Sequence, residues 1–190
     1  MITTLETERL VLRPFTRDDR AALSTLGAEE SFWWFGMRRG ATAEESSAFL
    51  ERVIASYEEE TPGIHAVVER ATGELAGYAG LSIPRFLPEV LPAIEVGWRL
   101  GTAYRGRGYA TEAGAAALTW GFTELGLTRV LSICEPDNIA SYRVMDHLGF
   151  DGGFATVHPV TGVPLVVRAL EVRRWSSGPP SPGDGLPARE

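Results

Sequence analysis

Hydrophobic and polar positions follow two different periods along this chain, and each change of period marks the boundary of a predicted element. Apolar residues at every second position, or in short unbroken runs, predict strands, whereas spacings of three and four predict helices. The predicted strands are 10–15, 65–69, 75–81, 93–100, 129–134, 156–157 and 165–173. The predicted helices are 17–26, a helix that begins after Thr42, 109–125 and 139–148.

Capping and turn residues support these boundaries. Thr16 precedes a helical run with acids in its first turn, and Thr42 followed by Glu45 forms a capping box. The segment 70–74 predicts a hairpin between the strands on either side of it. The order of elements predicts an α+β fold, with a mixed, mostly antiparallel sheet flanked by helices in a single domain, 1–175. The Pro-, Gly- and Ser-rich segment 176–190 predicts a disordered tail.

Composition narrows the functional classes. The 190 residues are 44% hydrophobic and 23% charged, which is typical of a globular chain. No apolar run is long enough to cross a membrane and no signal peptide is evident, so we expect a cytoplasmic protein. The net charge of −7 argues against a nucleic-acid partner and favours the approach of a cationic amine. The single Cys134 lies in a predicted strand, and the histidines show no metal spacing, so we expect no metal site.

The turn between the strand 93–100 and the helix 109–125 has the composition of an anion site. Gly106 and Gly108 allow a ligand to approach the backbone closely, and the helix supplies free N–H groups. Arg105 and Arg107 add positive charge. A dinucleotide-binding turn would need Gly or Ala where Thr111 stands. We interpret the turn as a phosphate site for a diphosphate ligand, with a solvated basic turn as the alternative.

The pattern Arg-x-x-Gly-x-Ala formed by Arg105, Gly108 and Ala110 resembles the acyl-CoA pyrophosphate loop of the GNAT N-acetyltransferases. Other segments resemble the same family in the same order, and these are 8–15, 94–100, 138–141 and 148–150. The opening segment is typical of the branch that contains the ribosomal-protein N-terminal (alanine) acetyltransferases. The resemblance implies a GNAT-like sheet, acetyl-CoA as the acetyl donor and an amine acceptor, and it also allows a homodimer.

The resemblance further implies which residues bind the cofactor. The central strand of the family separates from its neighbour, and the free backbone of Trp98, Arg99 and Leu100 would hold the pantetheine arm. A backbone N–H near Trp98 would receive the thioester oxygen, and Asn138 would bind pantetheine. The residues of the turn would bind the pyrophosphate, and these are Arg105, Gly106, Arg107, Gly108, Tyr109 and Ala110.

Two residues are candidates for proton transfer. Glu95 alternates with apolar neighbours in the central strand, and burial would raise the pKa of its carboxyl toward neutrality, where it can act as a base. A structural ion pair with an arginine is the alternative. Many members of the family carry a tyrosine acid where this chain has Met145, so Ser141 is the expected proton donor. Asn138 and Ser141 would otherwise serve as helix-capping residues.

The aromatic run 32–35 lies between the first two predicted helices. By resemblance, Trp33 and Trp34 would line the acceptor pocket, and the alternative is that they belong to the core. We therefore expect an acetyl-CoA-dependent transferase that acetylates a primary amine, either a protein N-terminus or a small molecule, by direct attack in a ternary complex. The alternative is a non-catalytic acyl-CoA-binding or sensing module on the same fold, which Met145 favours.

Overall fold

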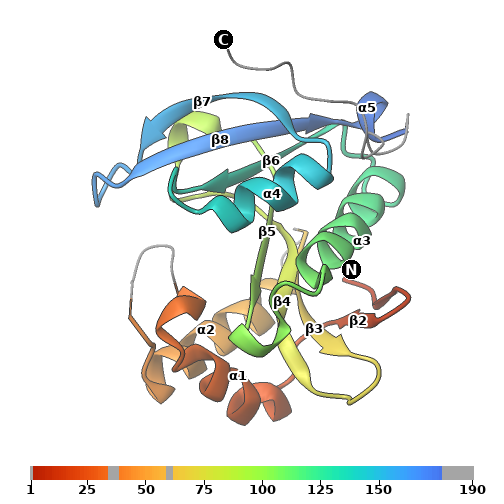
Figure 1. Cartoon of the computed structure of the whole chain (residues 1–190), viewed down its shortest axis with the longest axis vertical. Coiled ribbons are helices and arrows are strands. Elements are labelled where there is room, and N and C mark those ends of the chain that lie inside the picture. Colours follow the sequence, from red (N-terminus) through yellow and green to blue (C-terminus); the bar gives the residue numbers. More distant parts are fainter. Residues whose placement is uncertain (1, 34–38, 59–61, 177–190) are drawn as a thin grey trace.

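The computed structural model describes residues 2–33, 39–58 and 62–176. Within these ranges one mixed sheet has the order β1-β2-β3-β4-β5-β6-β8-β7, and only the β5–β6 pair is parallel (Figure 1). The strands are β1 (Leu5–Glu6), β2 (Leu10–Arg13), β3 (Ile64–Glu69), β4 (Leu75–Ser82), β5 (Glu95–Leu100), β6 (Arg129–Cys134), β7 (Asp151–Val157) and β8 (Pro164–Glu171). The predicted α+β fold with a mostly antiparallel sheet is confirmed.

The α-helices are α1 (Arg20–Gly27), α2 (Ala43–Ser56), α3 (Tyr109–Thr123), α4 (Ile139–His147) and α5 (Val172–Ser176). The predicted capping box starts α2: Thr42 Oγ1 accepts a hydrogen bond from the Glu45 N–H, and a Glu45 carboxylate oxygen accepts one from the Thr42 N–H. The predicted hairpin is also present, because β3 and β4 pair in antiparallel register.

The structure corrects the predicted boundaries at the C-terminal end. β7 begins at Asp151. Its pairing with β8 shifts in register across Gly152 and Gly153, and the strand is exposed almost throughout. An exposed edge strand has no buried face and therefore no alternating pattern to detect. The last predicted strand ends at Glu171, after which Val172 and Trp175, three residues apart, pack on the core from the helix α5.

The sheet carries a hydrophobic cluster on each face. Ala66 and Val67 are neighbours in β3 and belong to different clusters, since successive strand residues point to opposite faces. The face of Ala66 is covered by α1 and α2, and the face of Val67 is covered by α3, with α4 farther along the sheet (Figure 1). None of the helices described is long and apolar enough to span a membrane.

Candidate active site

The sheet opens between β5 and β6. Strand β4 pairs with β5 along its whole length, from Gly77 opposite Leu100 to Ser82 opposite Glu95. Strand β6 meets β5 at a single register pair, Glu95 with Leu131, next to a hydrogen bond from the Leu131 N–H to the Ile94 carbonyl. Beyond this pair β5 and β6 diverge (Figure 1). Among the described residues, no strand pairs with the edge of β5 that faces β6 from Val96 onward.

The backbone of β5 points ligand-binding groups into this opening. The Ile94 carbonyl faces β6, and backbone groups of a strand alternate from side to side, so Val96, Trp98 and Leu100 face the same way. The Trp98 N–H thus points toward the side on which a thioester is expected. Gly97 is not at a bulge, because the β4–β5 register is continuous across it. A Cβ on Gly97 would meet no heavy atom within 4 Å.

The side chains of β5 divide between the two faces of the sheet. Trp98 is partly buried and lies against α3, where a Cβ on Gly114 would be 3.5 Å from its ring. Leu100 is buried in the cluster beneath α3. Arg99 extends to the opposite face, where its guanidinium lies 4.9 Å from the centre of the Trp33 ring and donates to the Phe32 carbonyl at 3.2 Å. The side chains of these three residues therefore do not converge on one ligand. The backbone of Trp98 and the Leu100 N–H face the opening, whereas the backbone of Arg99 faces β4.

The turn before α3 has the backbone conformation that its glycines predict. Gly106 has φ of 70° and Gly108, the N-cap of α3, has φ of 80°, both in the left-handed region that favours glycine. The N–H groups of the first residues of an α-helix have no intrahelical partner. Those of Tyr109 and Ala110 are therefore available to an anion at the positive end of the helix dipole.

The charged side chains of this turn contact protein groups instead. Arg105 donates to the carbonyls of Leu100 and Ser31, both at 2.9 Å. Arg107 forms an ion pair with Glu69 at 2.7 Å, and the Tyr109 hydroxyl donates to the same carboxylate at 2.5 Å. Tyr109 is buried. These side chains hold the turn on the scaffold, and the backbone is left as its ligand-facing part.

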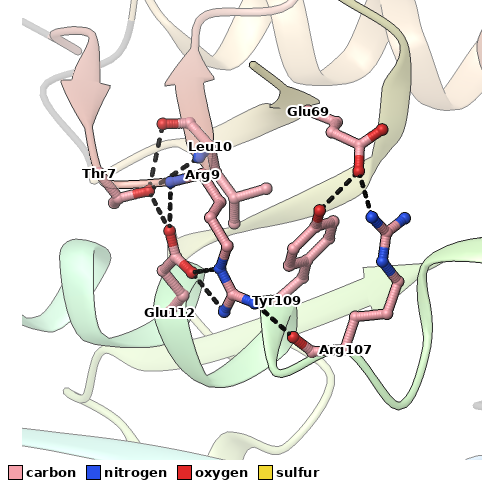
Figure 2. A network of polar contacts seen from close by, with 7 residues as sticks. All are labelled: Thr7, Arg9, Leu10, Glu69, Arg107, Tyr109 and Glu112. Carbon is pink, nitrogen blue, oxygen red and sulfur yellow. Dashed lines mark hydrogen bonds and ion pairs between the residues drawn. The ribbon is translucent and has the colours of Figure 1, made fainter. Parts of the chain in front are cut away.

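The same turn is attached to the N-terminal strands by residues that the sequence analysis missed. Figure 2 shows Glu112, in the first turn of α3, in contact with Thr7 and Arg9 from the loop between β1 and β2. The two sides of this contact are 103 positions apart in the chain, between Arg9 and Glu112. Arg9 lies in the opening segment 8–15 and Glu112 in the helix that follows the turn. No short-range sequence pattern could have predicted that they form a pair.

Glu95 lies at the point where β5 and β6 separate. Burial raises the pKa of its carboxyl to about 7, although the hydrogen bond from Ser82 and the charge of Arg99 act in the opposite direction. The Ser82 hydroxyl donates at 3.2 Å, a long distance for this kind of bond. The expected rise in pKa is therefore present. A carboxyl that titrates near pH 7 can accept a proton from an ammonium group at neutral pH.

Helix α4 brings the remaining candidates to the β6 side. The Asn138 side chain caps the helix, because its Oδ1 accepts a hydrogen bond from the Ser141 N–H at 3.1 Å. This bond uses the backbone of Ser141 and leaves its hydroxyl free for other partners. Met145 is fully buried. Cys134 is also buried, and burial raises its pKa to about 11, which is consistent with a structural thiol.

Trp33 lies in the core beneath α2, with its ring edge-to-face against Phe32 and Phe49 at centroid distances of 5.4 and 5.3 Å. Its contact with Arg99 connects it to the face of β5 that carries Glu95. Trp34 lies outside the described residues. Within the described part of the chain, no group of three His, Cys, Asp or Glu side chains is placed to hold a metal ion.

Comparison with known proteins gives a consistent result. Residues 9–151 match the model of the acetyltransferase (GNAT) domain. The chain is 30% identical over 145 residues to the uncharacterized N-acetyltransferase YnaD of Bacillus subtilis, an alignment that covers 76% of this chain and 81% of YnaD.

Solved structures agree in fold. An acetyltransferase from Agrobacterium tumefaciens superposes with a TM-score of 0.71 at 28% identity, covering 90% of this chain and 95% of that one. The ribosomal alpha-N-protein acetyltransferase RimL, solved in complex with coenzyme A, superposes with a TM-score of 0.71 at 18% identity, covering 89% of this chain and 98% of that one.

Proposed function

Because the chain belongs to the GNAT family of N-acetyltransferases, we propose that it transfers the acetyl group of acetyl-CoA to a primary amine by direct attack within a ternary complex. The observation that carries this proposal is the position of Glu95. Its carboxyl, with a pKa of about 7, lies where β5 and β6 separate, at the closed end of the opening that leads along β5 toward the turn.

The chain offers groups that suit each part of the donor. The turn at Gly108 would bind the diphosphate with the N–H groups at the start of α3. The free edge of β5 would pair with the amide groups of pantetheine, as a missing strand would, and Asn138 would add a contact from the β6 side. The Trp98 N–H would donate to the thioester oxygen and stabilise the negative charge that develops there.

In the reaction the acceptor ammonium loses two protons and the leaving thiolate gains one. Glu95 accepts a proton from the acceptor ammonium, directly or through water, and this frees the nitrogen lone pair. The nitrogen attacks the thioester carbon and the new C–N bond forms, the C–S bond breaks with its electron pair on sulfur, and the nitrogen gives up its second proton to solvent to leave the neutral amide. Ser141 protonates the leaving thiolate and recovers a proton from solvent, because Met145 carries no transferable proton.

The acceptor would reach Glu95 from the face of β5 that carries Arg99, which lies against the Trp33 ring, opposite the face on which α3 packs. Trp33 would form part of this wall. Two classes of acceptor fit a site of this kind, a protein N-terminus and a small-molecule amine. The fold shared with RimL, whose name describes an alpha-N-protein acetyltransferase, favours the protein N-terminus.

A non-catalytic acyl-CoA-binding module is the second candidate, and buried Met145 is the observation that favours it. Release of free CoA thiol, measured with N-terminal peptides and with small amines, separates the two functions. We expect turnover with at least one acceptor at pH 7, and a loss of about 100-fold in kcat/KM for Glu95→Gln that is smaller at pH 9, where more of the amine is already neutral. Glu124→Gln, an exposed carboxylate at the end of α3, is the matched control.

CoA binding without turnover on any acceptor would favour the binding module. Equal losses for Glu95→Gln at both pH values would instead leave Glu95 a structural residue and contradict its role as the base.

A further inference from the structure

The turn that begins α3 is held by a cluster of charged and polar side chains from three parts of the chain (Figure 2). Thr7 and Arg9 come from the loop between β1 and β2, Glu69 ends β3, and Arg107, Tyr109 and Glu112 belong to the turn and the first helical turn. Two acidic and two basic side chains balance in this cluster. It therefore adds no net charge to attract an anion, and its effect must come from where each charge is placed.

Glu112 creates an electrostatic problem for the expected ligand. Its Cα lies about 4.5 Å along the helix axis from Tyr109, because an α-helix rises 1.5 Å per residue. A carboxylate so close to the helix N-terminus is stabilised by the helix dipole when no ligand is bound, but it repels a bound diphosphate. Burial tends to raise the pKa of Glu112, but hydrogen bonds from Thr7 and Arg9 outweigh it and lower the pKa. The carboxylate is therefore charged at neutral pH.

Arg9 neutralises this carboxylate with two nitrogens of its guanidinium. Its Nε and Nη2 both lie 2.6 Å from Glu112 Oε2, and its backbone N–H donates to Oε1 at 2.9 Å. The Thr7 hydroxyl donates to the same Oε1 at 2.6 Å. Only 15% of the Glu112 side chain is exposed, so solvent screens its charge poorly and Arg9 is its principal counter-charge.

Arg9 also sets the orientation of the peptide group that enters α3. Its Nη1 donates to the Arg107 carbonyl at 2.8 Å, and a Cβ on Gly108 would lie 3.3 Å from its Nη2. In a trans peptide the C=O and the following N–H point in opposite directions. A carbonyl of Arg107 held on Arg9 therefore directs the N–H of Gly108 away from Arg9 and toward the open side of the turn.

We propose that Arg9 is a positioning residue for the diphosphate of CoA, which holds the charge of Glu112 away from the bound anion and aims the Gly108 N–H at it. This inference rests on the proposed function, since it takes CoA as the ligand. Arg9 does not need to touch the cofactor, and its effect is confined to the diphosphate end of the molecule.

The test compares CoA with pantetheine, which lacks the diphosphate, by calorimetric titration of the full chain. We expect Arg9→Gln to weaken CoA binding about tenfold and to leave the Kd for pantetheine unchanged, because only the diphosphate meets the uncompensated carboxylate. In Arg9→Gln/Glu112→Gln that carboxylate is gone, and most of the lost affinity should return. Arg9→Lys keeps the charge and should bind CoA nearly as tightly as the parent.

Arg13→Gln is the matched control. Arg13, at the end of β2 and away from the turn, makes a similar bidentate ion pair with Asp19, with N–O distances of 2.6 and 2.8 Å. It should lower the melting temperature without changing the Kd for CoA. Melting curves of all the variants identify any that fail to fold, and the double variant and Arg9→Lys remain informative if Arg9→Gln is one of them.

Three results would overturn the inference: CoA binding by Arg9→Gln equal to that of the parent, a double variant no better than the single one, or an equal loss of pantetheine affinity. A parent chain that binds neither CoA nor pantetheine would instead refute the proposed function, and this inference with it.

Discussion

The two ends of the candidate site hold carboxylates whose pKa values are shifted in opposite directions. At the turn, Glu69 receives hydrogen bonds from Tyr109 and Thr72 as well as the charge of Arg107, and these contacts lower its pKa. Where β5 and β6 separate, Glu95 has one long hydrogen bond from Ser82, and burial raises its pKa to about 7. Hydrogen bonds thus dominate the shift at Glu69, which anchors the turn, and burial dominates the shift at Glu95, which can exchange a proton near neutral pH.

This difference fits the two tasks that we propose for the site. A turn that receives a diphosphate has to be correctly shaped before the ligand arrives, so its charges are paired and its backbone is restrained. A base must change its charge during the reaction, and a carboxylate with several strong partners would be too weakly basic at neutral pH. Substitutions in the turn should therefore weaken cofactor binding, whereas substitution of Glu95 should change proton transfer.

The largest effect is expected from Gly108→Val, which alters the turn and leaves Glu95 untouched. A β-branched residue with φ near 80° is strained by about 1–3 kcal/mol, and its side chain would press on Arg9 and fill the space of the diphosphate. We expect acetyl-CoA affinity to fall by at least about 100-fold in calorimetry, roughly 3 kcal/mol of binding free energy.

Gly126→Val is the control for this variant, because Gly126 also has positive φ, at 65°, and a Cβ there would meet nothing within 4 Å. It carries the same backbone strain outside the turn and should keep its acetyl-CoA affinity. Tight acetyl-CoA binding by a folded Gly108→Val protein would refute the assignment of the phosphate turn.

Ser141→Ala tests the proposed protonation of the leaving thiolate. Loss of the hydroxyl should lower kcat about 10- to 100-fold, since water can partly replace a single general acid. Stability should hardly change, because the cap bond to Asn138 uses the Ser141 backbone N–H. Asn138→Ala, by contrast, removes the cap and should cost about 1 kcal/mol of unfolding free energy.

Ser24→Ala, in α1, is a matched helical control for kcat. A Ser141→Ala enzyme as fast as the parent would assign the proton on the leaving thiolate to water.

The most direct test of the contrast is the pH dependence of stability. Folded Glu95 holds its proton up to about pH 7, whereas the unfolded carboxyl releases it near pH 4.5. The folded state therefore binds more protons in this interval, and stability falls as the pH rises through it. Glu95→Gln removes this loss and should be more stable than the parent at pH 8 by up to roughly 3 kcal/mol in urea titrations, with a smaller difference at pH 5.

Glu112→Gln should behave in the opposite way. The pKa of Glu112 is lowered in the folded state, so its charge stabilises the protein above the unfolded pKa and this stabilisation is lost on acidification. The variant should be less stable than the parent at pH 8, and the difference should fade below about pH 4.5. Shifts of the same sign for the two variants would mean that their environments do not differ as described.

The sequence alone determined the parts of this protein that depend on a few neighbouring residues. Gly106 and Gly108 predict the turn because left-handed backbone is cheap only for glycine, and Thr42 with Glu45 predicts the start of α2 because the cap spans four consecutive residues. The direction of the pKa shift of Glu95 was also predictable. An acid that alternates with apolar residues in a central strand is desolvated by burial, and this raises its pKa whichever residues lie beside it.

Only the tertiary structure decided which side chains pair and where the sheet opens. Arg105 and Arg107 were expected to bind the anion, yet their guanidinium groups contact Ser31 and Glu69, and the partner of Glu112 comes from the other end of the chain. Such pairs depend on which strands become neighbours. The separation of β5 from β6 has no local marker either, because Gly97 forms no bulge. Short-range preferences set the conformation of each segment, whereas charge pairing and strand separation arise only when distant segments pack together.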